Sequence, residues 1–112
     1  MAVSQTQQPM TDLSAREARA LTERLFVVDN TPEVEGADDL FAVYNEEGDY
    51  HIVDSRTRSC TCKDHQFRCS QHRDMHCKHV HRVLYREGES ISPSWVDESR
   101  VDPLLLEVLK ND

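Results

Sequence analysis

The sequence contains little of what an enzyme or a membrane protein usually needs. It has three glycines, one tryptophan, three tyrosines and three phenylalanines among 112 residues, and no apolar run approaches the roughly 18 residues of a transmembrane helix. The opening stretch MAVSQTQQPM lacks the basic start and the apolar centre of a secretion signal. Neither a G-x-S-x-G nucleophile motif nor an open metal triad occurs. We therefore expect a cytoplasmic protein that is not an enzyme and binds no membrane.

The hydrophobic content is modest as well, at 38% of the residues. A chain of this length forms about one domain, and its core is small enough to gain from a covalent or metal staple. The chain has four cysteines. In a reducing cytosol, clustered cysteines indicate metal binding rather than disulfides.

The cysteines and histidines are concentrated in one segment. Residues 60–84, CTCKDHQFRCSQHRDMHCKHVHRVL, hold all four cysteines and five of the six histidines. Their order is Cys60-x-Cys62, fourteen residues, then Cys77-x-His79. Two residues of a strand end that are two positions apart share one face, so the first pair can converge on one ion. We therefore expect a metal site built around this segment.

The second pair needs a different local structure. Two residues that are two positions apart inside a helix point to nearly opposite sides, so Cys77 must lie at or before the N-cap with His79 in the first turn. Free N–H groups at a helix N-terminus favour the thiolate form of Cys77. Three thiolates and one imidazole satisfy Zn²⁺ and leave no coordination position open, which indicates a structural rather than a catalytic zinc.

Other ligand sets remain possible from the residues alone. One uses Cys60, Cys62, Cys69 and His72, another uses all four cysteines, and a second metal can be imagined on Cys69, His72 and His76. We favour the set of Cys60, Cys62, Cys77 and His79, with Cys69 as an unligated thiol of the spacer.

Local patterns around the cluster predict the secondary structure. A capping box of Ser14 and Glu17 predicts a helix over about 15–25, followed by a short strand at 26–28. LFAVYN and DYHIVDS predict a β-hairpin that turns at Gly48. An amphipathic helix follows Cys77 and ends near Gly88, and a last helix begins after Asp102 as N-cap.

These elements predict an α+β fold: a small antiparallel sheet with a ββα zinc finger, flanked by N- and C-terminal helices. Residues 1–12 are expected to be a disordered tail, and residues 13–112 a single domain with the finger at about 40–88. On the helix after Cys77, Val80, Val83 and Leu84 form the predicted buried stripe, while His81, Arg82, Tyr85 and Arg86 face elsewhere. The leucines of the last helix are expected to pack on Trp95 or on a second copy in a homodimer.

The segment resembles the SWIM-type zinc finger, whose pattern is Cys-x-Cys, a variable spacer and Cys-x-His. Cys60, Cys62, Cys77 and His79 match its four ligands, and the similarity extends over about residues 40–87, from the strand in YHIVD through CTCKD to CKHVHRVL. The resemblance implies a ββα unit that holds Zn²⁺ and is associated with DNA binding or protein contacts. It implies no single activity.

The charge pattern points to a partner. The formal net charge is −8, yet residues 56–86 carry eight basic side chains and two acidic ones. A local basic face can contact phosphates even on an acidic protein, and the expected contacts are Arg56, Arg58, Lys63, Arg68, Arg73 and Arg82. We therefore expect nucleic acid as the partner, with a protein partner, bound through the finger or the C-terminal helix, as the alternative.

Overall fold

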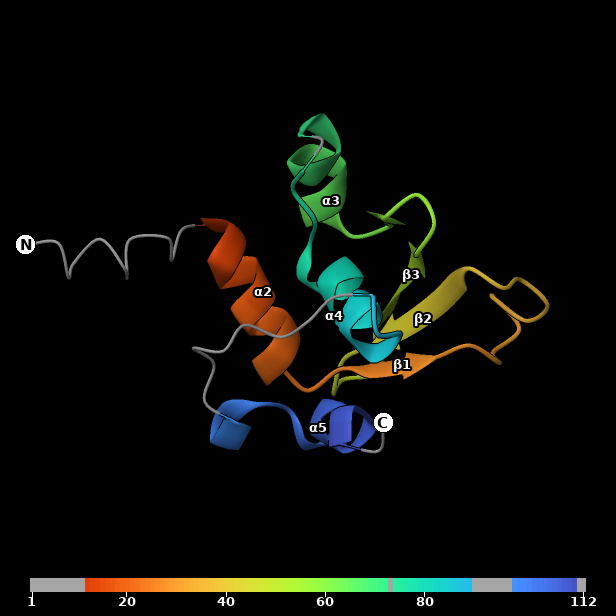
Figure 1. The fold of residues 1–112 in the computed structure, drawn as a ribbon. Helices are drawn as coiled ribbons and strands as arrows, with labels where there is room; N and C mark the ends of the chain where they lie inside the picture. The colour runs from red at the N-terminus through yellow and green to blue at the C-terminus, as the bar shows by residue number, and fades with distance from the viewer. Residues whose placement is uncertain (1–11, 73, 90–97, 111–112) are drawn as a thin grey trace, which may run out of the picture.

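The computed structural model describes residues 12–72, 74–89 and 98–110. In this part of the chain, a four-stranded antiparallel sheet is combined with helices on one side and at one end (Figure 1). The predicted α+β class is therefore confirmed. None of the described helices is long and apolar enough to cross a membrane.

The sheet has the strand order β1-β2-β3-β4. Its centre is the predicted hairpin of β2 (Leu40–Tyr44) and β3 (Tyr50–Asp54), in the register Leu40↔Asp54 and Tyr44↔Tyr50. Gly48 takes the turn with a φ of 92°, a conformation that a residue without Cβ adopts at little cost. The edge strands are β1 (Phe26–Val28), which pairs with β2, and β4 (Ser59–Cys60), which pairs with β3. The first metal-ligand candidate thus ends an edge strand.

Helix α4 (Lys78–Arg86) lies at the centre of the molecule, between the sheet and α2 (Asp12–Thr22), with α5 (Pro103–Lys110) beyond it (Figure 1). Its predicted stripe packs into the main core, where Val80 and Val83 are fully buried beside Phe41 and Val53. The helix ends as predicted, because Gly88 has a φ of 79° and its N–H donates to the Tyr85 carbonyl at 3.2 Å.

The prediction for the opposite face of α4 is wrong, because this face is buried as well. His81, Arg82 and Tyr85, expected to face away from the core, are 6%, 2% and 1% exposed. Tyr85 packs with Leu21 of α2 and Leu105 of α5 in a second, smaller core cluster. Periodicity predicts one apolar stripe, but α4 is covered on both sides because α2 and α5 converge on it.

The terminal helices follow the predictions in part. α2 begins at Asp12, so Ser14 lies inside the helix and not at its N-cap. α5 begins as predicted, since the Leu104 N–H donates to the Asp102 carboxylate at 3.3 Å. Leu105 is buried, Leu106 and Leu109 pack on the second cluster, and Leu104 remains 41% exposed. Trp95 and residues 1–11 of the predicted tail lie outside the described residues.

Candidate metal centre

The four predicted ligands come from one strand end and two helix N-termini. Cys60 is the last residue of β4. Cys62 is the N-cap of α3 (Lys63–Phe67), and its sulfur accepts a hydrogen bond from the His65 N–H at 3.4 Å. Cys77 is the N-cap of α4, with extended backbone angles of −74° and 169°, and His79 follows in the first turn. The local placement of Cys60, Cys77 and His79 is the one that their spacing predicts.

The ligand atoms of these residues converge. One atom from each of Cys60, Cys62, Cys77 and His79 lies within 4.8 Å of all the others. The His79 Nδ1 atom is 3.7 Å from the Cys60 sulfur and 3.8 Å from the Cys77 sulfur. Ordinary zinc bond lengths in a tetrahedron put sulfur and nitrogen roughly 3.6 Å apart. The group is therefore positioned to bind a metal ion, and its donor set of three sulfurs and one imidazole nitrogen is one that zinc prefers.

Crowding of the three sulfurs favours a cation between them. Hydrogen bonding with the Cys62 sulfur raises the pKa of Cys60 to about 12. Hydrogen bonds with the other two sulfurs raise the pKa of Cys77 and lower that of Cys62. A divalent cation would replace the thiol protons that these hydrogen bonds hold, because the thiolate is the form that binds metal.

Groups around the ligands support the charge and position of the site. The Cys62 N–H donates to the Cys60 sulfur at 3.4 Å, and such second contacts stabilise thiolate ligands. The ring of His51 on β3 lies 4.9 Å from the ring of His79, centroid to centroid. The sequence offers no signal for this contact, since it depends on the packing of α4 against the sheet.

An open pocket of about 330 Å³ borders the centre on the side of α2. Three ligands, Cys62, Cys77 and His79, line it together with three cations and two carboxylates: Arg16, Arg19, Lys78, Glu23 and Asp64. A centre of three thiolates and Zn²⁺ has a charge of about −1. The excess of one positive charge in the pocket lining would offset that charge.

The alternative ligand sets are not assembled. Among the residues that the structure describes, the four-residue group above is the one compact cluster of Cys, His, Asp and Glu ligand atoms. Cys69 is 2% exposed, and its sulfur lies 3.7 Å from a carboxylate oxygen of Asp64. Burial and this carboxylate raise the pKa of Cys69 to about 11, and His72 is exposed. Cys69 thus lies apart from the metal group, as expected.

The spacer between the two ligand pairs is folded, which the sequence did not predict. It forms α3 and a 3₁₀ turn, η1 (Cys69–Gln71). Asp64 in α3 accepts two hydrogen bonds of 2.9 Å from the Arg16 guanidinium of α2, which lowers the pKa of Asp64. This pair joins residues 48 positions apart, so local sequence carries no sign of it.

Four of the six predicted phosphate contacts lie at the surface. Arg56, Arg58, Lys63 and Arg68 are exposed, whereas Arg73 lies outside the described residues. The prediction that Arg82 contacts phosphates is wrong, because its side chain is buried and does not reach solvent.

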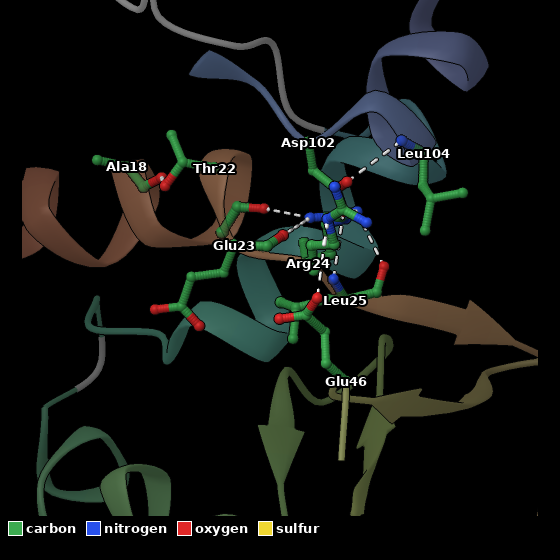
Figure 2. A network of polar contacts seen from close by, with 10 residues as sticks. Ala18, Thr22, Glu23, Arg24, Leu25, Glu46, Asp102 and Leu104 are labelled. Atoms are coloured by element: carbon green, nitrogen blue, oxygen red, sulfur yellow. Dashed lines mark hydrogen bonds and ion pairs between the residues drawn. The ribbon is translucent and has the colours of Figure 1, made fainter. Parts of the chain in front are cut away.

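The Arg82 guanidinium instead joins four parts of the fold. It pairs with the Asp102 carboxylate and donates to the carbonyls of Ala20, Glu23 and Leu25 at 2.9–3.0 Å. Figure 2 shows the neighbourhood of Asp102, where its carboxylate also accepts from the N–H groups of Leu25 and Leu104. We call Arg82, Asp102 and these carbonyls the Arg82 anchor. It ties α4 to the end of α2, the start of β1 and the start of α5.

No family model, curated protein or solved structure matches this chain.

Proposed function

We propose that this protein is a stand-alone zinc finger of the SWIM type, an accessory or regulatory factor whose zinc ion holds a nucleic-acid-binding surface. The observation that carries the proposal is the convergence of Cys60, Cys62, Cys77 and His79, which joins the hairpin, the spacer and α4 at one point. A zinc ion there leaves no coordination position for substrate, so its role is structural and the protein is not an enzyme. A reducing compartment such as the cytoplasm is part of the proposal, because it keeps the four free thiols available to bind zinc.

The basic side chains near this point are the proposed contacts to nucleic acid. Arg56 and Arg58 lie in the turn between β3 and β4, directly before Cys60, and Lys63 and Arg68 lie in the spacer. Arg56 and Arg58 have carboxylate neighbours at 3.8 Å and 3.5 Å, at exposed pairs that contribute little energy. Phosphates can replace such partners, and each contact to phosphate releases counterions. DNA and RNA both offer this chemistry.

A salt series on the zinc-loaded protein tests the proposal. Binding to labelled duplex DNA, single-stranded DNA and RNA is measured from about 50 to 300 mM salt, where phosphate contacts weaken steeply. The Lys63→Gln/Arg68→Gln variant is expected to bind more weakly and to lower the salt slope by about one for each lost contact. The matched control is Arg24→Gln/Arg100→Gln, which removes two exposed cations that are not among the proposed phosphate contacts. Absence of binding to every nucleic acid at the lowest salt contradicts the proposal.

A protein-interaction adapter is the second candidate, and one surface favours it. A groove of about 300 Å³ runs between edge strand β1 and α5, lined by residues 25–28 and by Leu104, Leu105 and Val108. Phe26 and Leu104 are each 41% exposed there. The same groove is where a homodimer would form. A Leu104→Asp variant with an unchanged molar mass in light scattering, and no partner lost from pull-down, argues against this candidate.

A further inference from the structure

The spacer carries the most exposed large apolar side chain of the described residues. Phe67, the last residue of α3, is 67% exposed, compared with 41% for Phe26, Tyr50 and Leu104. α3 and η1 project from the body of the protein on the side away from α5 (Figure 1). Phe67 therefore contributes little to the core, and its exposure calls for another explanation.

Two cations flank this ring. Lys63 lies four positions before Phe67 on the same helix, so the two side chains share a face of α3, and Arg68 follows directly. Both cations are exposed. Within the described residues neither forms an ion pair, whereas Arg16, Arg24, Arg56, Arg58, Lys78, Arg82 and Arg86 do. The acidic neighbour Asp64 is already held by Arg16 at 2.9 Å, so these two charges are available to a ligand.

The surroundings of Phe67 distinguish between partners. A protein-binding hot spot places its aromatic ring inside a wider apolar patch. Phe67 instead has polar, exposed neighbours, among them Gln66, Arg68 and Ser70. A single exposed ring with free cations beside it is the combination that binds single-stranded nucleic acid, because bases stack on the ring while the cations follow the backbone. In a duplex the base faces are covered by their neighbours and are not free to stack.

The position of the ring depends on the metal centre. Cys62 caps α3 through the His65 N–H, and the Gln66 side chain donates to the Thr61 carbonyl at 2.8 Å. The Ser70 hydroxyl donates to the Gln66 carbonyl at 3.0 Å and links α3 to η1. The helix that carries Phe67 thus starts at a metal ligand and is held by its own short-range hydrogen bonds.

We propose that Phe67 stacks on a base of single-stranded nucleic acid while Lys63 and Arg68 contact the adjacent phosphates. This inference rests on the proposed function and narrows it to one substrate class. It also assigns Phe67 a binding role that the charge pattern alone does not suggest.

The test compares strands that differ only in what they offer the ring. Zinc-loaded protein is titrated by fluorescence anisotropy into labelled strands of about 12 nucleotides: a mixed single strand, an abasic strand with the same phosphates, and a duplex. The variants are Phe67→Ala, Phe67→Leu and Phe67→Trp, with Tyr50→Ala as the matched exposed-aromatic control. Zinc content and circular dichroism establish that each variant is folded.

The proposal predicts the tightest binding to the mixed single strand. Loss of one stacked base lowers affinity about tenfold, so Phe67→Ala and Phe67→Leu weaken this complex by that factor. Phe67→Trp and Tyr50→Ala leave the affinity for the mixed single strand within about twofold of the wild type. None of these Phe67 and Tyr50 variants changes binding to the abasic strand. Lys63→Gln/Arg68→Gln weakens binding to all three strands.

Two results would overturn the inference, and they differ in whether the proposed function also fails. If Phe67→Ala binds every strand as the wild type does while Lys63→Gln/Arg68→Gln weakens binding, the stacking role is wrong and the proposed function stands. If no strand binds at any salt concentration, both are wrong, and the groove between β1 and α5 becomes the surface to study.

Discussion

The first turn and the middle of α4 are held in different ways. At its N-terminus, Cys77 and His79 meet Cys60 and Cys62 in a group that is positioned to bind a metal ion. In its second turn, Arg82 meets Asp102 and three carbonyls, and every charge and hydrogen-bond acceptor is supplied by the chain itself. With zinc bound as proposed, the first site is expected to respond to zinc supply, pH and chelators. The second is part of the fold under all conditions in which the fold exists.

The comparison also assigns each site a region of the protein. The metal group joins the finger, which carries the proposed binding surface, to the main core. The Arg82 anchor joins α2, β1 and α5 around the second cluster of Leu21, Tyr85 and Leu105. Because α4 belongs to both, each site helps to position the other. In this small protein with a limited apolar core, the metal group and the Arg82 anchor thus both connect one central helix to the rest of the fold.

The largest expected effect is the loss of a metal ligand. Zinc binding in small zinc domains supplies about 10–16 kcal/mol, which is comparable to the whole stability of a domain of this size. We expect Cys77→Ser to lose zinc and to leave residues 56–88 without protection from hydrogen exchange. Amide exchange followed by mass spectrometry measures this, and protection of residues 56–88 equal to that of the wild type would contradict it.

Removal of the anchor sharpens the comparison, because it should destabilise the fold while zinc remains bound. Arg82→Ala leaves Asp102 as a buried unpaired charge, and breaking such a pair costs about 3–5 kcal/mol. Urea denaturation measures the loss, and zinc analysis at neutral pH should find the wild-type content. The control is Arg86→Ala, whose 2.5 Å pair with Glu87 is nearer the surface and should change stability by less than about 1 kcal/mol. Equal effects of the two variants would remove the distinction that we draw.

A smaller effect comes from His81, which lies between the two sites. Burial lowers the pKa of His81 to about 4, with His76, Arg16 and Arg58 adding repulsion, and its Nε2 atom has no partner among the described residues. The unfolded chain therefore binds the proton first, and stability falls as the pH drops below the unfolded value of about 6.5. Between pH 7 and 5.5 the loss is roughly 1 kcal/mol.

The His81→Leu variant isolates this contribution. Leucine does not titrate, so the variant should lose less stability than the wild type over the same pH interval, measured by urea denaturation at each pH. Parallel pH profiles for the two proteins would show that His81 is not the group responsible.

The smallest expected effect concerns Cys69, the thiol that is buried near the metal group but outside it. Cys69→Ser should keep the zinc content of the wild type, measured per chain by atomic absorption, because the Cys69 sulfur faces Asp64 and not the ligands. A halved zinc content would instead make Cys69 a ligand and reopen the alternative sets.

Features set by neighbouring residues were predictable from the sequence. The hairpin at Gly48, the Gly88 end of α4, the Asp102 cap of α5 and the N-cap position of Cys77 all depend on conformations within a few positions of the residue concerned. The placement of Cys77 and His79 followed from the same local geometry, whereas Cys62, expected to share a strand face with Cys60, is the N-cap of α3 instead.

Features set by distant contacts were not predictable. The exposure expected for Arg82 was wrong because its partners lie 20 to 62 positions away along the chain. Short elements such as α3 have too few residues for a periodic pattern, and α3 is held by Cys62 and by Arg16 rather than by an apolar stripe. Arginine is also almost never fully buried without a partner, so a sequence pattern alone assigns it to the surface.

The central claim is that Cys60, Cys62, Cys77 and His79 together bind one zinc ion. X-ray absorption spectroscopy at the zinc edge of the purified protein tests it most directly. We expect equimolar zinc with three sulfur neighbours at about 2.3 Å and one nitrogen at about 2.0 Å. Zinc surrounded by oxygen and nitrogen alone, or by four sulfurs, would contradict this ligand set.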